Sequence, residues 1–460
     1  MVVNMQNKLR SIHRAAWTAV LCVACTANTI AATTNAPLIP GNDGLTAVRQ
    51  SDSWKIALAP HSGNEKLDEQ IRKLQDAIRT LADPRAHLER LGWLYVAKAR
   101  ASHDPGFYKL AEHCALALQS HAAKSPEALL LRGHVEQSLH RFKEAEAIAR
   151  ELVARREFAF DHGLLGDALA DQGKLDEAIA EYQRMVDLRP DLQSYSRVAH
   201  ARWLKGDLSG AIEAAELAAR ACSPADADSA AWAFTRLATY EFQAGALVKA
   251  ETACQAALEF VKDYPPALLL RGKMLLSPGK AGDAVEVTRR AVAKSPLPEY
   301  QWTLADALRA AGLTNEAITI EAELTRTGAA NDPRALALFL ATRGEQVGLA
   351  LRLAERELKD RGDVFTHDAL AWALFNSARH AEAWNSMKRA LAEGTQDARL
   401  FLHAGAIAAR LGHNDAGRWL KQARELERLL LPSERRRLDD ALQLLSRNET
   451  PVPSLAADAP

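Results

Sequence analysis

Leucine, alanine and other small apolar residues recur along this chain at the spacing of an α-helix, in stretches separated by short polar turns. Between Asp161 and Pro190, one such stretch ends at Gly173 and a second begins at Leu175. Apolar residues three and four positions apart share one face of a helix. Glycine adopts the left-handed backbone that ends many helices, and proline cannot continue one. The pattern therefore predicts two helices joined by a tight turn.

One alanine near the start of the second helix recurs through most of the chain and shows that the two-helix pattern is a repeat. Its successive spacings are 34, 33, 33, 39, 34, 33, 33, 33 and 33 residues. The alanines are Ala111, Ala145, Ala178, Ala211, Ala250, Ala284, Ala317, Ala350, Ala383 and Ala416. A period in the low thirties indicates stacked two-helix units. We therefore predict an all-α fold of about ten helix-turn-helix units.

The units resemble tetratricopeptide repeats, whose pattern has a small residue at position 8, alanine at position 20 and proline at position 32. Position 8 is small in these copies: Gly92, Gly133, Gly166, Ala199, Ala238, Gly272, Ala305, Ala371 and Ala404. Pro126, Pro190 and Pro296 match position 32, whereas Leu338 takes position 8 of the eighth unit. The resemblance covers residues 85–427. It implies a superhelical solenoid with a concave inner groove that binds partners.

The first 32 residues have the order of a secretory signal. Three basic residues precede an apolar run at 15–23, and small residues follow up to Ala32. This order predicts a signal peptide over 1–32 and an exported protein, with the bacterial periplasm as the expected compartment. A lipid anchor on Cys25 is a second interpretation, and secretion beyond the envelope is a third.

Four further segments flank the repeats. We expect a flexible N-terminal segment at 33–63, an N-terminal capping helix at 64–84, a C-terminal capping helix at 428–446 and a disordered tail at 447–460. A solenoid needs a polar helix at its end because the last unit has no neighbour to cover it. The segments 33–63 and 447–460 both contain Pro, Ala and Asn. Terminal segments of this kind are typically mobile.

Charge and hydropathy limit the class of partner. Lys and Arg number 58, and Asp and Glu also number 58. A nucleic-acid binder needs a basic surface for phosphate, so we expect no nucleic-acid partner. Beyond residue 32 no stretch reaches the ~20 apolar residues of a membrane span, so we expect no transmembrane span in the mature chain. The sequence gives no oligomeric state.

The chain shows no pattern typical of an enzyme or a metal site. It has no phosphate-binding glycine loop, no G-x-S-x-G and no H-E-x-x-H. The closest histidine pairs, His113 with His121 and His134 with His140, are eight and six residues apart. These spacings do not place two ligands on one helix face. We therefore predict a non-enzymatic protein with no cofactor and no metal.

Three cysteines follow the predicted signal, namely Cys114, Cys222 and Cys254. Cys222 and Cys254 lie in neighbouring repeats, so a disulfide between them is one interpretation in an oxidising compartment. The other interpretation is that all three are small buried thiols.

Aromatic residues concentrate on a second stripe of the first helix in each unit, at positions 2, 5, 9 and 12. Eleven of the 19 Phe and Trp beyond residue 32 lie there: Trp93, Phe160, Trp203, Trp232, Phe242, Trp302, Phe339, Phe365, Trp372, Phe375 and Phe401. Charged residues interleave with them: Asp167, Lys273, Glu299, Asp306 and Arg309. The resemblance implies that this stripe lines the concave groove. The aromatics either fill space between successive helices or anchor a partner segment.

These observations predict a non-enzymatic exported scaffold that binds protein or peptide partners in a concave aromatic groove, in the bacterial cell envelope. The interleaved charges have mixed signs and do not predict a strongly charged ligand. Two alternatives remain. One is an envelope assembly factor tethered to the membrane, and the other is a protein that binds a small molecule or glycan through the groove aromatics.

Overall fold

The computed structural model describes residues 51–102, 104–121 and 125–449. All of them belong to one unit, Gln50–Pro460. The predicted signal peptide, with Cys25, and residues 450–460 of the tail predicted over 447–460 lie outside the described residues. Residues 447–449 of that tail are helical in the structure, as the end of the last helix. Within the described ranges the regular elements are helices and no strand occurs, so the predicted all-α class is confirmed.

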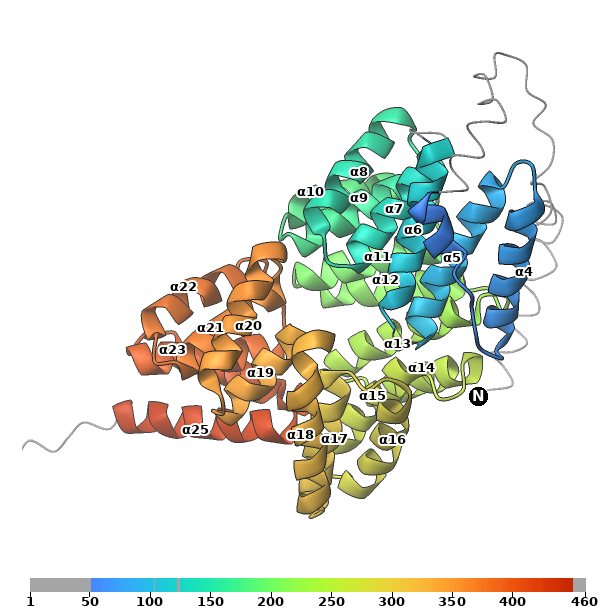
Figure 1. Cartoon of the computed structure of the whole chain (residues 1–460). Helices are drawn as coiled ribbons and strands as arrows, with labels where there is room; N and C mark the ends of the chain where they lie inside the picture. The colour runs from blue at the N-terminus through green and yellow to red at the C-terminus, as the bar shows by residue number, and fades with distance from the viewer. Residues whose placement is uncertain (1–50, 103, 122–124, 450–460) are drawn as a thin grey trace, which may run out of the picture. The chain divides into compact units, whose positions relative to one another are not determined.

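Ten helix pairs follow one another along the chain, which confirms the predicted repeat solenoid (Figure 1). The pairs are α5 (Arg85–Ser102) and α6 (Gly106–His121), α7 (Pro126–Ser138) and α8 (Phe142–Arg155), α9 (Ala159–Asp171) and α10 (Leu175–Leu188), α11 (Leu192–Leu204) and α12 (Leu208–Arg220), α13 (Ala227–Gln243) and α14 (Leu247–Phe260), α15 (Pro265–Leu276) and α16 (Ala281–Lys294), α17 (Pro298–Ala310) and α18 (Thr314–Asn331), α19 (Pro333–Arg343) and α20 (Val347–Asp360), α21 (Val364–Asn376) and α22 (His380–Ala390), and α23 (Ala398–Leu411) and α24 (Ala416–Glu425).

Small residues explain how closely the two helices of a pair approach. Every alanine of the recurrent column is at most 1% exposed. A Cβ atom on Gly166 would lie 2.4 Å from the ring of Tyr182 on the second helix of the same pair. A larger side chain at these positions would force the helices apart, and the lost contacts would cost stability.

Three further helices flank the pairs. α4 (Lys66–Thr80) lies within the predicted N-terminal cap. α3 (Asp52–Ala57) lies within the segment predicted to be flexible, and its Trp54 is buried while the helix contacts α6. α25 (Pro432–Glu449) follows a short 3-10 turn, η1 (Glu427–Leu429). It contacts α24 as an end cap does, but it also reaches α17, α19 and α23 (Figure 1).

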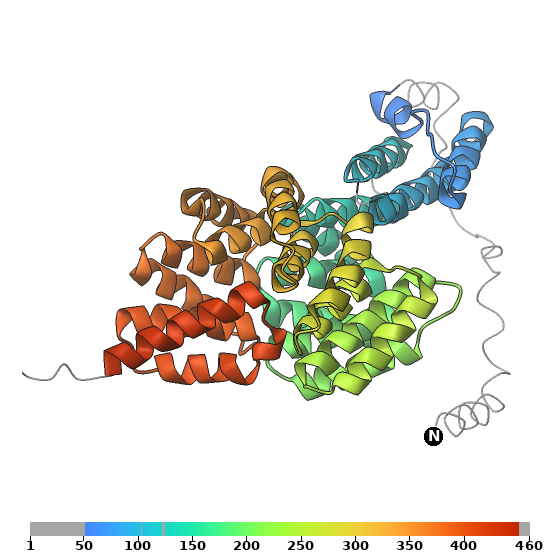
Figure 2. The ribbon, with the colours of Figure 1, turned by 90° about the horizontal axis from the view of Figure 1, so that it is seen from below.

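The array turns back on itself, so that early repeats touch late ones. The turn between α9 and α10 meets the turn between α20 and α21, where the Gly362 N–H donates to the Asp171 carbonyl at 2.9 Å. The turn that follows α11 makes a similar contact with the segment between α22 and α23. There Thr395 Oγ1 donates to the Leu204 carbonyl at 2.6 Å. Arg428 Nε, near the end of the array, donates to the Phe242 carbonyl at 3.2 Å. The pairs therefore pack against distant pairs as well as adjacent ones (Figure 2).

A continuous hydrophobic core reflects this arrangement. One cluster of buried apolar residues extends from Leu175 in α10 to Ala441 in α25 and includes residues of eight repeats, the third to the tenth. Among the described helices, none is both long enough and apolar enough to cross a membrane.

The cysteines within the described residues are thiols. Cys114 and Cys254 are buried and Cys222 is half-buried, and none forms a disulfide. Burial raises the pKa of Cys222 to about 11 and that of Cys254 to about 12. The structure therefore corresponds to the interpretation in which all three are packing residues, with Cys222 and Cys254 unpaired.

Candidate partner-binding surface

The first helices of the repeats form the inner layer of the array. In most repeats the first helix contacts the first helix of the next repeat, as α5 contacts α7 and α21 contacts α23. No two successive second helices make comparable contact within the described residues. The first helices therefore lie at the smaller radius, which is where the sequence placed the aromatic stripe.

The aromatic residues of the stripe differ widely in exposure. Six are buried: Trp203, Phe242, Trp302, Phe339, Trp372 and Phe401. Three are half-buried: Trp93, Phe365 and Phe375. Phe160 and Trp232 are exposed, at 42% and 40%. Their role in partner binding stays a prediction, and only the half-buried and exposed members offer side-chain surface in this conformation.

In the seventh to ninth repeats the buried aromatics lie beneath α25, whereas Phe401 of the tenth stacks on Trp419 of α24. Trp302 Nε1 donates to Ser433 Oγ at 3.1 Å. The guanidinium of Arg437 lies 5.1 Å from the ring centroid of Trp372. Phe339 packs edge-on against Trp302, with 5.8 Å between ring centroids. The chain itself thus occupies this part of the inner face.

In the middle of the array two buried aromatics hold distant repeats together. Trp203 of α11 stacks on Phe365 of α21, with ring centroids 5.5 Å apart. Phe242 of α13 is 3% exposed, and its carbonyl accepts the hydrogen bond from Arg428. For these residues the structure corresponds to the packing interpretation that the sequence left open.

The two exposed aromatics of the stripe and the half-buried Trp93 lie in the first five repeats, whereas the half-buried Phe365 and Phe375 lie in the ninth. Trp93 packs against His134 with 5.3 Å between ring centroids, and Arg189 lies 5.0 Å from the Phe160 ring. Trp232 keeps 40% of its surface exposed although it lies on a first helix. Large apolar side chains gain free energy when they leave water, so exposed rings on an inner layer are typical of a docking surface.

The predicted charged residues all have partners within the chain. These contacts are Asp167 with Arg197, Lys273 with Glu299, Asp306 with Ser433, and Arg309 with Glu321. The nearby Lys273 ammonium lowers the pKa of Glu299 to about 2, against the opposing effect of burial. These charges therefore position helices of the array, and partner binding by them stays a prediction.

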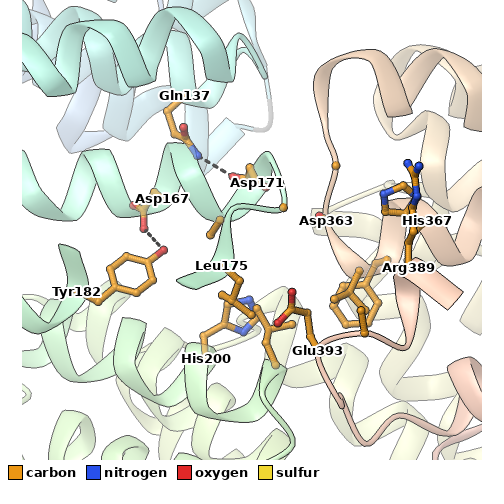
Figure 3. Close-up of a pocket in the computed structure, with 17 residues that line it drawn as sticks. Gln137, Asp167, Asp171, Leu175, Tyr182, His200, Asp363, His367, Arg389 and Glu393 are labelled. Atoms are coloured by element: carbon orange, nitrogen blue, oxygen red, sulfur yellow. Dashed lines mark hydrogen bonds between the residues drawn. The ribbon is translucent and has the colours of Figure 1, made fainter. Parts of the chain in front are cut away.

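A cavity lies where the early and late repeats face each other, and the sequence did not predict it. It has a volume of about 500 Å³ and is lined on one side by α9, α10 and α11 and on the other by α21 and the end of α22 (Figure 3). Asp167, Asp171 and His200 line the early side, and Phe365, His367 and Arg389 line the late side. Of these residues Asp167, His200 and Phe365 lie at stripe positions, and only Asp167 and Phe365 are among the predicted partner-binding residues. The rest come together through contacts between repeats far apart in the sequence.

The carboxyl of Asp171 is the most perturbed acid of this cavity. Burial raises its pKa to about 6, and the negative charges of Asp363 and Asp167 add to the effect, while Arg361 opposes it. Gln137 Nε2 donates to Asp171 Oδ2 at 2.7 Å (Figure 3). Asp171 is thus an acceptor of hydrogen bonds that changes charge close to neutral pH.

The two histidines of the cavity are held neutral. Burial lowers the pKa of His200 to about 3, and the adjacent Arg236 guanidinium lowers it further. Burial also lowers the pKa of His367, together with the charge of Arg389. A neutral imidazole offers one donor and one acceptor, so both side chains suit hydrogen bonds with an uncharged polar group.

The cavity has the properties of a binding site for a side chain or small group. Its volume lies within the roughly 300–1,000 Å³ of ligand pockets, and its lining combines apolar and polar groups. Within the described residues, no group of three or more His, Cys, Asp or Glu is placed to hold a metal ion. The arrangement supports binding by hydrogen bonds and apolar contact.

Comparisons with known proteins give a family and three structural relatives. The family model named Tetratricopeptide repeat matches residues 130–193 and 164–227. A thermophilic tetratricopeptide-repeat protein of Thermus thermophilus is 19% identical, with 41% of this chain and 97% of that chain covered and a TM-score of 0.36. The APC/C hetero-tetramer Cut9-Hcn1 is 14% identical, covering 79% of this chain and 66% of that one, with a TM-score of 0.43. Yeast Tom70 is 13% identical, covering 83% and 93%, with a TM-score of 0.35. No curated protein matches the chain.

Proposed function

The chain is a tetratricopeptide-repeat protein, and on that premise we propose that it is an exported, non-enzymatic scaffold that binds a segment of a partner protein along the inner face of its first five repeats. Tetratricopeptide repeats bind protein or peptide partners. The partner segment lies along the first helices α5 to α13 and buries apolar side chains against the exposed and half-buried aromatics there.

The exposure of Trp232 carries this proposal. The residue is 40% exposed on a helix of the inner layer, whereas Trp302 and Trp372, the tryptophans at stripe positions in the late repeats, are 2% and 1% exposed. The late rings are covered by α25, whereas the early ring lies on a part of the same stripe that the described residues leave partly uncovered. Rigid aromatic side chains bind partners with little loss of conformational entropy.

Crosslinking in cell envelopes with the full chain as bait tests the site. We expect native protein to capture a defined partner, and Phe160→Ala with Trp232→Ala to lose that partner while retaining its helical signal and melting temperature. Ile318→Ala is the matched control, because Ile318 is 52% exposed on α18, a second helix. Equal capture by native protein and the double variant would exclude this surface as the binding site.

Export is a separate part of the proposal and has its own measurement. What supports it is the order of basic, apolar and small residues at 1–32. We expect the mature protein to begin after Ala31 or Ala32 and to fractionate with the periplasm. A mature chain that begins at Cys25 with added lipid mass would instead establish the tethered alternative.

A further inference from the structure

Helix α25 lies on the inner face of the late repeats in the way that a bound partner helix would. It contacts α17, α19 and α23, and it lies alongside the late repeats in both views (Figures 1 and 2). We propose that the inner face of α17, α19, α21 and α23 is a docking surface for an amphipathic helix of a partner protein, and that α25 is the resident helix that the partner helix replaces.

The surface recognises the first turn of a helix through Asp306. Its Oδ2 atom accepts the Ser433 N–H at 2.9 Å and the Ser433 hydroxyl at 2.5 Å. A carboxylate at this place satisfies N–H groups that have no partner inside a helix and lies at the positive end of the helix dipole. Burial raises the pKa of Asp306 to about 6, so this carboxylate depends on a helix end that donates to it.

Two charged contacts fix the register of the helix on the surface. Arg399 Nε on α23 lies 2.5 Å from Glu434 Oε1, and the Glu434 side chain is buried. One turn later, Arg437 Nη2 donates to Asn376 Oδ1 on α21 at 2.7 Å. The surface therefore favours a helix with an acid in its first turn and an arginine three residues after it.

The apolar side of the helix joins the aromatics of the stripe. Leu438 and Ala441 are 0% and 6% exposed and belong to the same buried cluster as Trp302 and Trp372. Residues 434, 437, 438 and 441 have the spacing of one helix face. A partner helix is thus expected to carry Glu, Arg, Leu and a small residue at these relative positions, which is the helix-in-groove mode of recognition.

The contact between α25 and the surface is closely packed along Leu438 but leaves an open cleft at its edge and one unpaired donor. A cleft of about 400 Å³ lies between α25 and the end of α19, and Thr342 and Asp439 are among its lining residues. The buried Nη2 of Arg435 has no hydrogen-bond partner among the described residues. Buried ion pairs such as Arg399 with Glu434 fix geometry more than they add net stability. Such an interface is suited to exchange with a helix of the same pattern.

A labelled peptide with the sequence of residues 430–449 tests the exchange in trans. The full chain with Glu434→Arg has a weakened resident helix and an unchanged Arg399, so we expect it to bind the peptide at least tenfold more tightly than the native chain does. Asp440→Arg is the matched control, because Asp440 is an exposed acid on the same helix. We expect this variant to bind the peptide as weakly as the native chain.

The peptide also has a control of its own. A peptide in which the residue corresponding to Glu434 is arginine should not bind the Glu434→Arg chain, because it places two guanidinium groups together. Failure of the native-sequence peptide to bind the folded Glu434→Arg chain would overturn the proposal. Equal binding to all three chains would overturn it as well, because the peptide would then be binding elsewhere.

Hydrogen exchange of the native full chain gives a second measurement that needs no variant. An exchangeable resident helix should open more often than the helix beneath it. We therefore expect amides of residues 435–441 in α25 to exchange at least tenfold faster than those of α23. Equal protection of the two helices would show that α25 is a fixed part of the fold. Neither experiment involves α5 to α13, so its outcome is independent of the proposed function.

Discussion

Gly173 and Gly362 meet through their backbones, although Gly173 lies in the third repeat and Gly362 in the turn between the eighth and ninth repeats. A Cβ atom on Gly173 would lie 2.2 Å from the Gly362 carbonyl oxygen, and one on Gly362 would lie 2.7 Å from the Gln172 carbonyl oxygen. Gly206 and Gly394 are related in the same way one repeat further along the chain. A Cβ atom on Gly206 would lie 2.5 Å from the Gly394 carbonyl oxygen. Neither contact has room for a side chain, so the closure of the array depends on glycine.

We predict that Gly362→Ala destabilises the chain by about 1–3 kcal/mol, because the new methyl group forces two backbones apart. Gly362 does not have a positive φ, so the loss reports the contact and not backbone strain. The measurement is the midpoint and slope of urea unfolding of the full chain. Gly282→Ala is the control, because a Cβ at this position in α16 meets nothing within 4 Å. It should stabilise the helix by about 0.5–1 kcal/mol. A loss of stability in both variants would show that the effect is not specific to the closure.

The stacked rings of Trp203 and Phe365 predict an energetic coupling between early and late repeats. Aromatic pairs contribute about 0.5–1.5 kcal/mol beyond the area that they bury. A double-mutant cycle with Trp203→Ala and Phe365→Ala, read by urea unfolding, should give a coupling of that size. The same cycle with Phe160 and Phe365 should be additive within roughly 0.5 kcal/mol, since no contact joins those rings. Additivity in the first cycle would show that stacking does not hold the closure.

The raised pKa of Asp171 predicts a stability that increases as the pH falls. Its folded value is about 6, above the roughly 3.9 of an unfolded aspartate. Stability from this group is therefore present at low pH and is lost as the pH rises through about 6. The loss between pH 5 and pH 7 is about 1 kcal/mol. Asp171→Asn should remove that part of the pH dependence, as measured by urea unfolding at several pH values.

Glu146 provides the control for the pH experiment. Burial raises its pKa, but hydrogen bonds from Lys174, Gln172 and Arg150 outweigh burial and bring the value to about 2. Its contribution is present above the unfolded value and is lost only as the pH falls toward 2. Glu146→Gln should therefore leave the slope between pH 5 and pH 7 unchanged. A slope that Asp171→Asn leaves unaltered would contradict the assignment to Asp171.

The repeat fold could be predicted because its determinants are local. Ala145 and Ala178 are 0% exposed, and each acts on the helix packed beside it within one repeat or the next. Gly166 approaches Tyr182 in its own helix pair. The sequence repeats these determinants in phase, and a period of 33 or 34 residues makes them visible without any knowledge of distant contacts.

The candidate sites could be predicted only in part, because burial depends on contacts that no local pattern contains. Trp302 and Trp232 both lie on the aromatic stripe, but α25 covers the first and none of the described helices covers the second in this way, so their exposures are 2% and 40%. The cavity brings Asp171 to Phe365 across six repeats. A signal was present in Gly362 and Gly394, which are glycines outside the repeat pattern, but their role depends on which turns meet.

At Leu338 the repeat pattern and the observed packing predict opposite effects of a substitution by alanine. It occupies the position that is small in the other repeats, so the pattern alone would predict that Leu338→Ala is stabilising. In the structure Leu338 is 6% exposed and belongs to the main hydrophobic cluster, so the neighbouring helices have adapted to its volume. We therefore expect Leu338→Ala to lower the free energy of unfolding by about 2–4 kcal/mol through the cavity that it leaves. Leu188→Ala, at a leucine that is 48% exposed, should cost less than about 1 kcal/mol in the same urea titration. A gain in stability for Leu338→Ala would show that the eighth repeat is strained at this position.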